Sequence, residues 1–353
     1  MNRFRSCIIK TQIVLIFIIV VTFLGFVLLF PNESKNSVRN GLILCGEIII
    51  PSLFPFTCGA MFIFSTRLAK VFDYLLKIPS KLLFNSTSSV GTVFLMSLLG
   101  GFPVGAKLIA KLYNDEKINT KSANLLLTFC INGGPGFIIV AVGTGFLRSQ
   151  TAGIILFISS IISATIIGIA VTRKNKIELF SYYNEESISY SEGLIRSISD
   201  TGYSMIGISF FVVAFSVISS CLSTFLPDTF SKIITSFFEV TNGSLSFSKF
   251  GIAPTGLIIG FSGFAIHFQI FGICRNITIN YKYFYLGRII HGLLTMAFSF
   301  IIEKIFPITT PTVNFSGDII SSVSSSGATL SLIIMSSIMM IYVYIFYSER
   351  RKA

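Results

Sequence analysis

The residues of this chain that could do chemistry are a few ionisable side chains placed in or beside long apolar stretches. They are Glu47, Lys107, His267, Arg288 and His291. Burying such groups at membrane depth costs free energy, so they are functional candidates by default. Arg288 and His291 are three residues apart, which places both on one face of a helix. These residues could recognise a polar molecule within a membrane.

Some of these residues also have a purely structural interpretation. Lys107 and Lys111 are one helical turn apart and could both extend their ammonium groups to the membrane surface. Arg288 could anchor the end of a helix, and His267 could be a hydrogen-bonded histidine of the core. Both interpretations stay open at the level of sequence.

Three clusters of helix-breaking residues interrupt the apolar stretches: Gly100–Gly105, Asn132–Gly136 and Gly260–Gly263. A lone Gly or Pro in a membrane helix usually causes only a kink. A cluster frees several backbone N–H and C=O groups, which are costly in hydrocarbon and must therefore line protein or a wet cavity. The free N-termini of half-helices attract anions, and broken helices in both halves of a chain are typical of transporter binding sites.

The predicted substrate-binding residues lie at these clusters and beside the ionisable groups. They are Glu47, Gly101, Pro103, Gly105, Lys107, Asn132, Gly133, Pro135, Ser262, Gly263, His267, Gln269, Arg288 and His291.

Enzyme chemistry is not indicated. The chain has two histidines and lacks the H-E-x-x-H, G-x-S-x-G and P-loop patterns. Its six cysteines show neither C-x-x-C pairs nor metal-ligand spacing, so we expect no disulfides, no metal and no cofactor. Transport by this chain would be passive or coupled to an ion such as H⁺ or Na⁺.

The elements that must position these residues are membrane helices. Hydrophobic residues make up 52% of the 353 residues and charged residues only 12%, about half the share of a soluble domain. The charges are bunched, and most of the uncharged runs between them exceed the roughly 20 residues that span a bilayer core. The runs are Thr11–Asn32, Ile48–Thr66, Leu82–Ala106, Ser122–Leu147, Ser149–Thr172, Thr201–Pro227, Phe250–Cys274, Ile289–Ile302 and Ile319–Ser348.

The net charge of +12 does not imply nucleic-acid binding. Lys and Arg gather in loops and tails, where the positive-inside rule places them near anionic headgroups in the cytoplasm. The expected partners are the lipid bilayer and a small-molecule substrate.

The first apolar run is too long for a secretory signal and has no cleavage pattern, so we expect a retained helix.

Both chain ends are predicted to be cytoplasmic, from the basic residues of the first ten positions and the tail Glu349–Lys352. Two cytoplasmic ends require an even number of crossings, so one of the nine runs must enter and leave on the same side. Val38–Thr66, which contains Pro51 and Pro55, and Leu82–Ala106, which contains the first glycine cluster, are the candidates. The sequence does not choose between them.

A polar segment divides the chain into two halves and suggests internal duplication. Glu47–Leu53 and Glu239–Leu245 share a glutamate, a serine and a leucine at matched positions. We predict an N-terminal helix (1–37), a first repeat (38–172), a cytoplasmic linker (173–196), a second repeat (197–306) and a C-terminal helix with a basic tail (307–353).

Leu99–Lys107 followed by Phe129–Phe137 resembles the nucleoside-recognition or Gate-domain family. Within it, the likeness is to the sporulation integral membrane proteins of the YlbJ type. Phe238–Gly243, Gly260–Gly263 and Gly287–Gly292 resemble the later blocks of that family, so the likeness covers roughly residues 38–305.

The resemblance implies an all-α fold similar to concentrative nucleoside transporters, with about eight transmembrane helices plus re-entrant or broken helices in two repeats. It also implies a role in sporulation, as a transporter of dipicolinate across the outer forespore membrane; the cell membrane is the other expected location. At Asn132–Pro135 two glycines replace the bulkier polar residues usual in the family, which puts the substrate in doubt. A nucleoside-type transporter outside sporulation and a non-transporting scaffold for the spore cortex or coat are the alternatives.

Overall fold

The computed structural model describes residues 2–177, 179 and 189–307. Within them the regular structure is helical, apart from an isolated β-bridge between Ile118 and Leu179. By length and composition, five helical spans among the described residues could cross a membrane, or six if one bent pair counts as a span. The all-helical architecture with several membrane spans that the sequence predicts is therefore confirmed.

The helices follow one another in two series. The first series is α1 (Asn2–Leu29), α2 (Pro31–Leu44), η1 (Cys45–Ile49), α3 (Ile50–Ser65), α4 (Leu68–Leu75), α5 (Lys77–Phe84), α6 (Ser88–Gly100), α7 (Phe102–Asn114), α8 (Thr120–Phe129), η2 (Gly136–Phe146) and α9 (Gln150–Lys174). The second series is α10 (Tyr190–Phe225), α11 (Asp228–Phe238), α12 (Val240–Ser248), α13 (Ile252–Phe261), α14 (Gly263–Ile273) and α15 (Tyr281–Ile305).

One of the two candidates for an irregular early segment is a continuous helix. Helices α2 and α3 join through the π-helical turn η1 into one span, Pro31–Ser65. Proline removes a backbone donor, and π turns and serine side chains are means by which membrane helices absorb that loss. Here η1 ends two residues before Pro51, and the Ser52 hydroxyl donates to the carbonyl oxygen of Ile48 at 2.6 Å.

The other candidate does contain a break. Helix α6 ends at Gly100, α7 begins at Phe102, and Gly101 between them has a φ of 84°. The two helices pack against each other, so the chain reverses at Gly101. Upstream, Lys77–Phe84 and Ser89–Gly100 meet at 94°. The glycine cluster, and not the prolines, marks the irregular segment.

The two series share one order of elements. A long span (Pro31–Ser65 in the first, α10 in the second) precedes a helical hairpin, then a broken helix, then a straight helix of 25 residues, α9 or α15. The short sequence match between Glu47–Leu53 and Glu239–Leu245 does not pair structurally equivalent residues. Glu47 lies inside a continuous helix whereas Glu239 lies at the break between α11 and α12, so that alignment is wrong.

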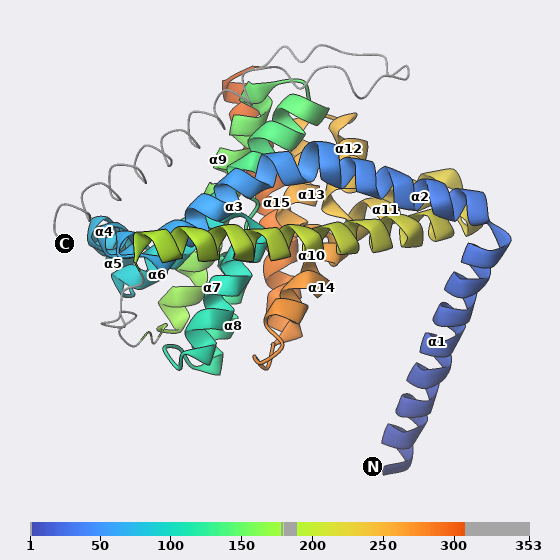
Figure 1. The fold of residues 1–353 in the computed structure, drawn as a ribbon, viewed down its shortest axis with the longest axis horizontal. Helices are drawn as coiled ribbons and strands as arrows, with labels where there is room; N and C mark the ends of the chain where they lie inside the picture. Colours follow the sequence, from blue (N-terminus) through green and yellow to red (C-terminus); the bar gives the residue numbers. More distant parts are fainter. Residues whose placement is uncertain (1, 178, 180–188, 308–353) are drawn as a thin grey trace.

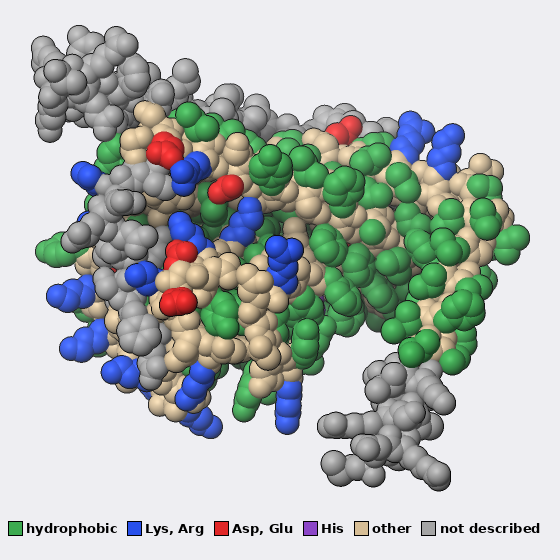
Figure 2. Space-filling view, turned by 60° about the horizontal axis from the view of Figure 1, so that its bottom comes forward, with side chains coloured by type: hydrophobic (Ala, Val, Ile, Leu, Met, Phe, Trp, Pro, Cys, Tyr) green, Lys and Arg blue, Asp and Glu red, His purple; other side chains and the backbone are tan. Residues whose placement is uncertain are grey.

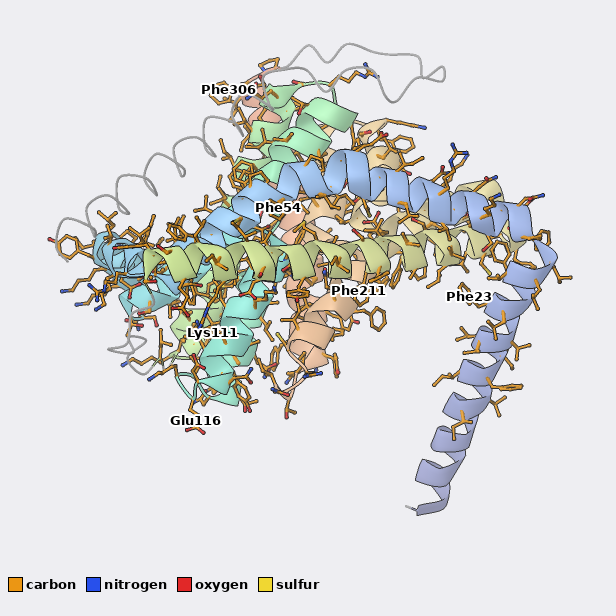
Figure 3. The ribbon with its side chains drawn as sticks, in the orientation of Figure 1. Phe23, Phe54, Lys111, Glu116, Phe211 and Phe306 are labelled. Carbon is orange, nitrogen blue, oxygen red and sulfur yellow. The ribbon has the colours of Figure 1, made fainter. Side chains whose placement is uncertain are left out.

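Figure 1 shows the long span α2–α3 and helix α10 running side by side across the molecule, with α7–α9 and α13–α15 crossing them. Helix α1 projects away from this body. Glu116, in the α7–α8 loop, and Phe306, after α15, mark opposite ends of the crossing helices (Figure 3). Helix α13 packs closely against α15, and α15 packs against α9, so α15 lies at the centre of the crossing group.

The predicted linker 173–196 is shorter in the structure. Helix α9 continues to Lys174 and α10 begins at Tyr190, because the Ser189 side chain caps its N-terminus by accepting from the Glu192 N–H at 3.3 Å. Residues 190–196 are therefore helical. Residues 178 and 180–188 of the linker, and the predicted C-terminal helix and tail from residue 308 on, lie outside the described residues.

The surface divides by residue type. Figure 2 shows a broad apolar surface over one part of the molecule, while Lys and Arg side chains gather over the left half of the view. Large apolar side chains on α1, α10 and α15 are exposed, among them Phe17, Phe210 and Leu293. Such a surface is expected of a protein surrounded by lipid.

Of the cysteines in the described side chains, Cys45, Cys130, Cys221 and Cys274 are buried and Cys58 is half-buried; all five are free thiols.

Candidate functional site: four helix breaks around a buried arginine

Two helix breaks of the first series lie against each other. The α6–α7 turn at Gly101 approaches the break between α8 and η2 so closely that a Cβ on Gly101 would lie 3.3 Å from the Gly134 nitrogen. A Cβ on Gly105 would lie only 2.0 Å from the carbonyl oxygen of Cys130. The Thr57 hydroxyl of α3 donates to the Gly100 carbonyl at 3.0 Å and so satisfies one freed backbone group. The glycines are needed here for close approach of two backbones.

Two breaks of the second series meet in the same way. Ser262 and Gly263, between α13 and α14, both have positive φ, 77° and 75°. A Cβ on Gly263 would lie 2.9 Å from the nitrogen of Val240, the first residue of α12. The break between α11 and α12 therefore packs on the break between α13 and α14, and each series supplies one hairpin and one broken helix.

Arg288 of α15 joins the two pairs of breaks. Its guanidinium donates to the carbonyl oxygen of Thr128 at 2.9 Å, to that of Ile131, and to the Ser262 hydroxyl at 3.5 Å. The side chain is fully buried, and the structure records no ion pair for it among the described residues. Its Nε has no hydrogen-bond partner. A buried cation balanced only by backbone dipoles and a hydroxyl is suited to bind an anion.

Four half-helices begin at the breaks. They are α7, η2, α12 and α14. Only α12 has a side-chain cap: the Glu239 carboxylate accepts from the N–H of Thr241 at 2.9 Å and of Asn242 at 2.7 Å. The N-termini of α7, η2 and α14 carry no side-chain cap. An uncapped N-terminus can present its unpaired N–H groups to an anion, although at α7 the N–H groups of Val104 and Gly105 already donate to the Gly101 carbonyl.

Glu239 is 1% exposed and lies outside the five candidate spans. Burial raises the pKa of its carboxyl above the ordinary value, and the hydrogen bonds from the Asn242 and Thr241 backbone act in the opposite direction. The sequence reasoning left Glu239 out of the site. Its signal was a carboxylate two residues before Thr241 and three before Asn242, the spacing of an acidic helix N-cap.

Both histidines of the chain are fully buried near Arg288. Nε2 of His267 lies 2.8 Å from the carbonyl oxygen of Phe261, and Nε2 of His291 lies 3.1 Å from that of Ser160. Since a carbonyl oxygen only accepts, each Nε2 carries the proton and each Nδ1 is an acceptor. Neither Nδ1 has a partner.

The ring of His267 lies within an aromatic cluster. Its centroid is 4.9 Å from that of Phe261, 5.2 Å from that of Phe284 and 5.5 Å from that of Tyr285. These contacts come from α13 and α15, so His267 of α14 is held between the broken helix and the helix that carries Arg288. The cluster can stack on an aromatic ligand.

The structure brings most of the predicted residues together and leaves others apart. Asn132, Gly133 and Ser262 are buried in the breaks, and Asn132 donates to the Ser97 hydroxyl at 3.2 Å. Pro103 is buried in the first turn of α7, and Pro135 is half-buried just before η2. Gln269 is buried on α14, two residues beyond His267.

Glu47 and Lys107 do not face the breaks. Glu47 is exposed on the long span. Lys107 Nζ donates to the carbonyl oxygen of Asp200 at 2.8 Å and to the Ser204 hydroxyl, both on α10. Lys107 therefore ties the hairpin helix α7 to the second long helix, a role that neither the site nor the membrane-surface interpretation anticipated.

Comparisons with known proteins agree with a membrane role. No model of a known protein family matches the chain. The chain is similar to the sporulation integral membrane protein YlbJ of Bacillus subtilis (strain 168), with 23% identity in an alignment of 320 positions; the alignment covers 78% of each chain. The chain is thus a multi-pass integral membrane protein and a distant homologue of a sporulation integral membrane protein.

Proposed function

We propose that the chain is a membrane transporter of a small anion and that the four breaks around Arg288 form its binding site. The observation that carries the proposal is a fully buried arginine without an ion pair among the described residues, beside uncapped half-helix N-termini from both series. Arg288 supplies a fixed charge with a planar fork of donors, and the N-termini supply backbone N–H groups.

Arg288 is one of the contacts that join the two series at the site. Arg288 of α15 holds the carbonyl oxygens at the C-terminal end of α8. An anion that accepts from the same guanidinium competes with these carbonyl oxygens and weakens the link between the series. Binding would in this way favour a second arrangement of the two halves, as alternating access requires.

Dipicolinate is the substrate we propose. It is a small aromatic dianion, so the guanidinium of Arg288 and the free N–H groups suit its carboxylates, and the aromatic cluster around His267 suits its ring. The name of the relative in Bacillus subtilis and the family resemblance both support a role in sporulation. The proposed location is the outer forespore membrane, with both chain ends in the cytoplasm of the mother cell.

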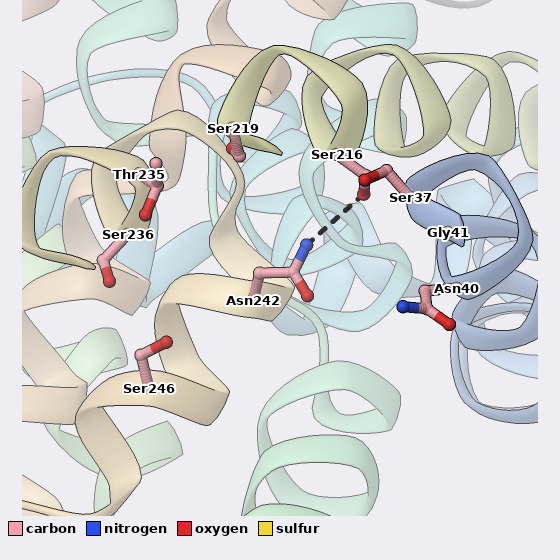
Figure 4. A pocket seen from close by; sticks show the side chains of 9 residues that line it. All are labelled: Ser37, Asn40, Gly41, Ser216, Ser219, Thr235, Ser236, Asn242 and Ser246. Atoms are coloured by element: carbon pink, nitrogen blue, oxygen red, sulfur yellow. Dashed lines mark hydrogen bonds between the residues drawn. The ribbon is translucent and has the colours of Figure 1, made fainter. Parts of the chain in front are cut away.

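A second candidate substrate, a neutral hydroxylated molecule such as a nucleoside, is favoured by one observation. A pocket of about 190 Å³ lies between α2, α10, α11 and α12 and is lined by uncharged residues only. They are Ser37, Asn40, Gly41, Ser216, Ser219, Thr235, Ser236, Asn242 and Ser246 (Figure 4). The Ser219 hydroxyl has no hydrogen-bond partner. The pocket is smaller than the roughly 300–1,000 Å³ of most ligand sites, so the anion site is the stronger proposal.

Flux into liposomes tests this proposal. Liposomes that contain the purified chain should take up labelled dipicolinate, with or without an imposed H⁺ or Na⁺ gradient. His267→Ala should reduce the uptake at least about ten-fold, the effect of ~1.4 kcal/mol, because the ring contacts to Phe261 and Phe284 are lost.

The matched control is Phe268→Ala, the adjacent residue on α14, which is 51% exposed and should transport normally. Uptake of uridine but not of dipicolinate would favour the second candidate. Absence of flux for both compounds under every gradient would leave a non-transporting scaffold as the better account.

A further inference from the structure

A larger cavity lies on the outer side of the group α8, α9 and α15. It is a groove of about 1240 Å³, larger than the roughly 300–1,000 Å³ usual for drug-sized ligands. Lys121, Lys174 and Lys282 line it together with apolar residues such as Ile166, Leu286 and Ile290. Its size and mixed lining suit a long molecule with one charged end.

The charge of the groove is of one sign. The three lysines come from three elements: the first turn of α8, the last turn of α9 and the first turn of α15. No Asp or Glu lines the groove, and the structure records no ion pair for the three lysines among the described residues. Two of the three lie at helix N-termini, where the helix dipole adds positive potential. The site therefore attracts an anionic group.

The apolar part follows α15, a helix long and apolar enough to cross a membrane. Tyr281 and Tyr283 lie at the charged end and are 55% and 62% exposed, as in the aromatic belts of membrane interfaces. From Leu286 to Leu294 the groove follows α15. Nine residues of helix rise roughly 12 Å between first and last, which is most of the ~15 Å depth of one leaflet.

The groove reaches the surroundings of the buried arginine. Thr128 and Gly287 line it, and they are in contact, since a Cβ on Gly287 would lie 2.6 Å from Thr128 Cγ2. The carbonyl oxygen of Thr128 accepts from Arg288. An occupant of the groove would thus support the contact between α8 and α15 from the outside.

We propose that this groove binds one anionic phospholipid, with its phosphate between Lys121, Lys174 and Lys282 and an acyl chain along Leu286–Leu294. Basic pockets between membrane helices on the cytoplasmic side are known to hold anionic headgroups. A lipid fits better than a soluble anion because the apolar part continues through most of one leaflet. The proposal does not depend on the proposed transport function.

The chain contains no tryptophan, so a single introduced tryptophan reports on one place. Leu286→Trp places the reporter in the groove, and Phe210→Trp on α10, 71% exposed, places it on an ordinary lipid-facing surface. The probes are vesicles with brominated phosphatidylglycerol or brominated phosphatidylcholine. At the groove reporter, the apparent affinity for phosphatidylglycerol should exceed that for phosphatidylcholine by about five-fold for each lysine that contributes. At position 210 the two lipids should quench about equally.

Replacement of the three lysines by glutamine should make the apparent affinities of the groove for phosphatidylglycerol and phosphatidylcholine nearly equal. Lys304→Gln, at the opposite end of α15, is the matched control and should leave the preference for phosphatidylglycerol unchanged. The proposal is overturned by equal quenching with both lipids, by a preference that survives the triple replacement, or by the same preference at position 210. Loss of the preference in inorganic phosphate, but not in sodium chloride of equal ionic strength, would assign the lysines to a soluble anion instead.

Discussion

At the residue scale, Arg288 decides whether the breaks can hold an anion. Its charge is buried without a carboxylate partner among the described residues. Such burial costs free energy unless the N–H groups of the guanidinium are hydrogen-bonded. Two carbonyl oxygens and one hydroxyl accept hydrogen bonds from the guanidinium, and its Nε has no partner. Arg288 therefore keeps one unpaired donor, its Nε–H, available to a ligand.

Gly263 gives a test of the breaks at the same scale. Its φ of 75° and the 2.9 Å between an added Cβ and the Val240 nitrogen leave no room for a side chain. Gly263→Ala should lower the unfolding free energy by about 1–3 kcal/mol, measured by circular dichroism on heating the protein in detergent. Gly272→Ala on the same helix has nothing within 4 Å of the new Cβ and should be neutral or slightly stabilising. Equal melting temperatures for both variants would contradict the backbone contact.

The sequence identified most residues of the breaks because clustered glycines and prolines in an apolar run cannot continue a regular membrane helix. It could not show that Lys107 turns to α10, since the direction of a long side chain depends on the packing of distant helices. It also missed Glu239, whose importance comes from complete burial at a helix N-terminus. Sequence reveals the residue types at a site, whereas burial and direction are properties of the fold.

At the scale of elements, each series joins its broken helix to its straight helix through a pair of glycines. A Cβ on Gly143 of η2 would lie 2.5 Å from the Gly153 Cα of α9, and one on Gly260 of α13 would lie 2.7 Å from the Gly292 Cα of α15. Small residues at helix contacts are the usual means by which membrane helices pack closely. The shared device fits the shared order of elements in the two series, whose duplication stays a prediction.

The α13–α15 contact can be tested by filling it. Gly260→Leu should push α13 from α15, shift Arg288 relative to Ile131, and so reduce both thermal stability and dipicolinate uptake. Gly207→Leu on α10, where an added Cβ meets nothing within 4 Å, is the control and should insert and transport normally. Normal uptake by a stable Gly260→Leu protein would show that the spacing of these helices is not needed.

The pattern of elements was only partly accessible from sequence. The prolines at 51 and 55 looked like a break as much as the glycines at 100 and 101 did. The helix continues through both prolines, with the π turn just upstream of Pro51, whereas Gly101 adopts a positive φ and reverses the chain. Such local compensation is decided by geometry that residue types do not specify.

At the scale of the whole molecule, the exposed basic residues and the helix breaks are proposed to bind different ligands, an anionic phospholipid and a small soluble anion. Among the described residues, the exposed Lys121, Lys174 and Lys282 line the outer groove, while the proposed substrate site depends on one buried arginine. We propose that lipid headgroups meet the basic surface and that a soluble anion reaches the buried Arg288 when the two series separate. Orientation and substrate remain proposals that follow from this arrangement.

Equilibrium binding of labelled dipicolinate to the purified chain in detergent shows whether the helix breaks around Arg288 hold an anion. We expect saturable binding to the unaltered chain and its loss in Arg288→Gln, while Arg275→Gln, which changes an exposed arginine just after α14, binds normally. Circular dichroism confirms that both variants are folded. Equal binding by a folded Arg288→Gln protein, or no binding by the unaltered chain, would contradict an anion site at the helix breaks.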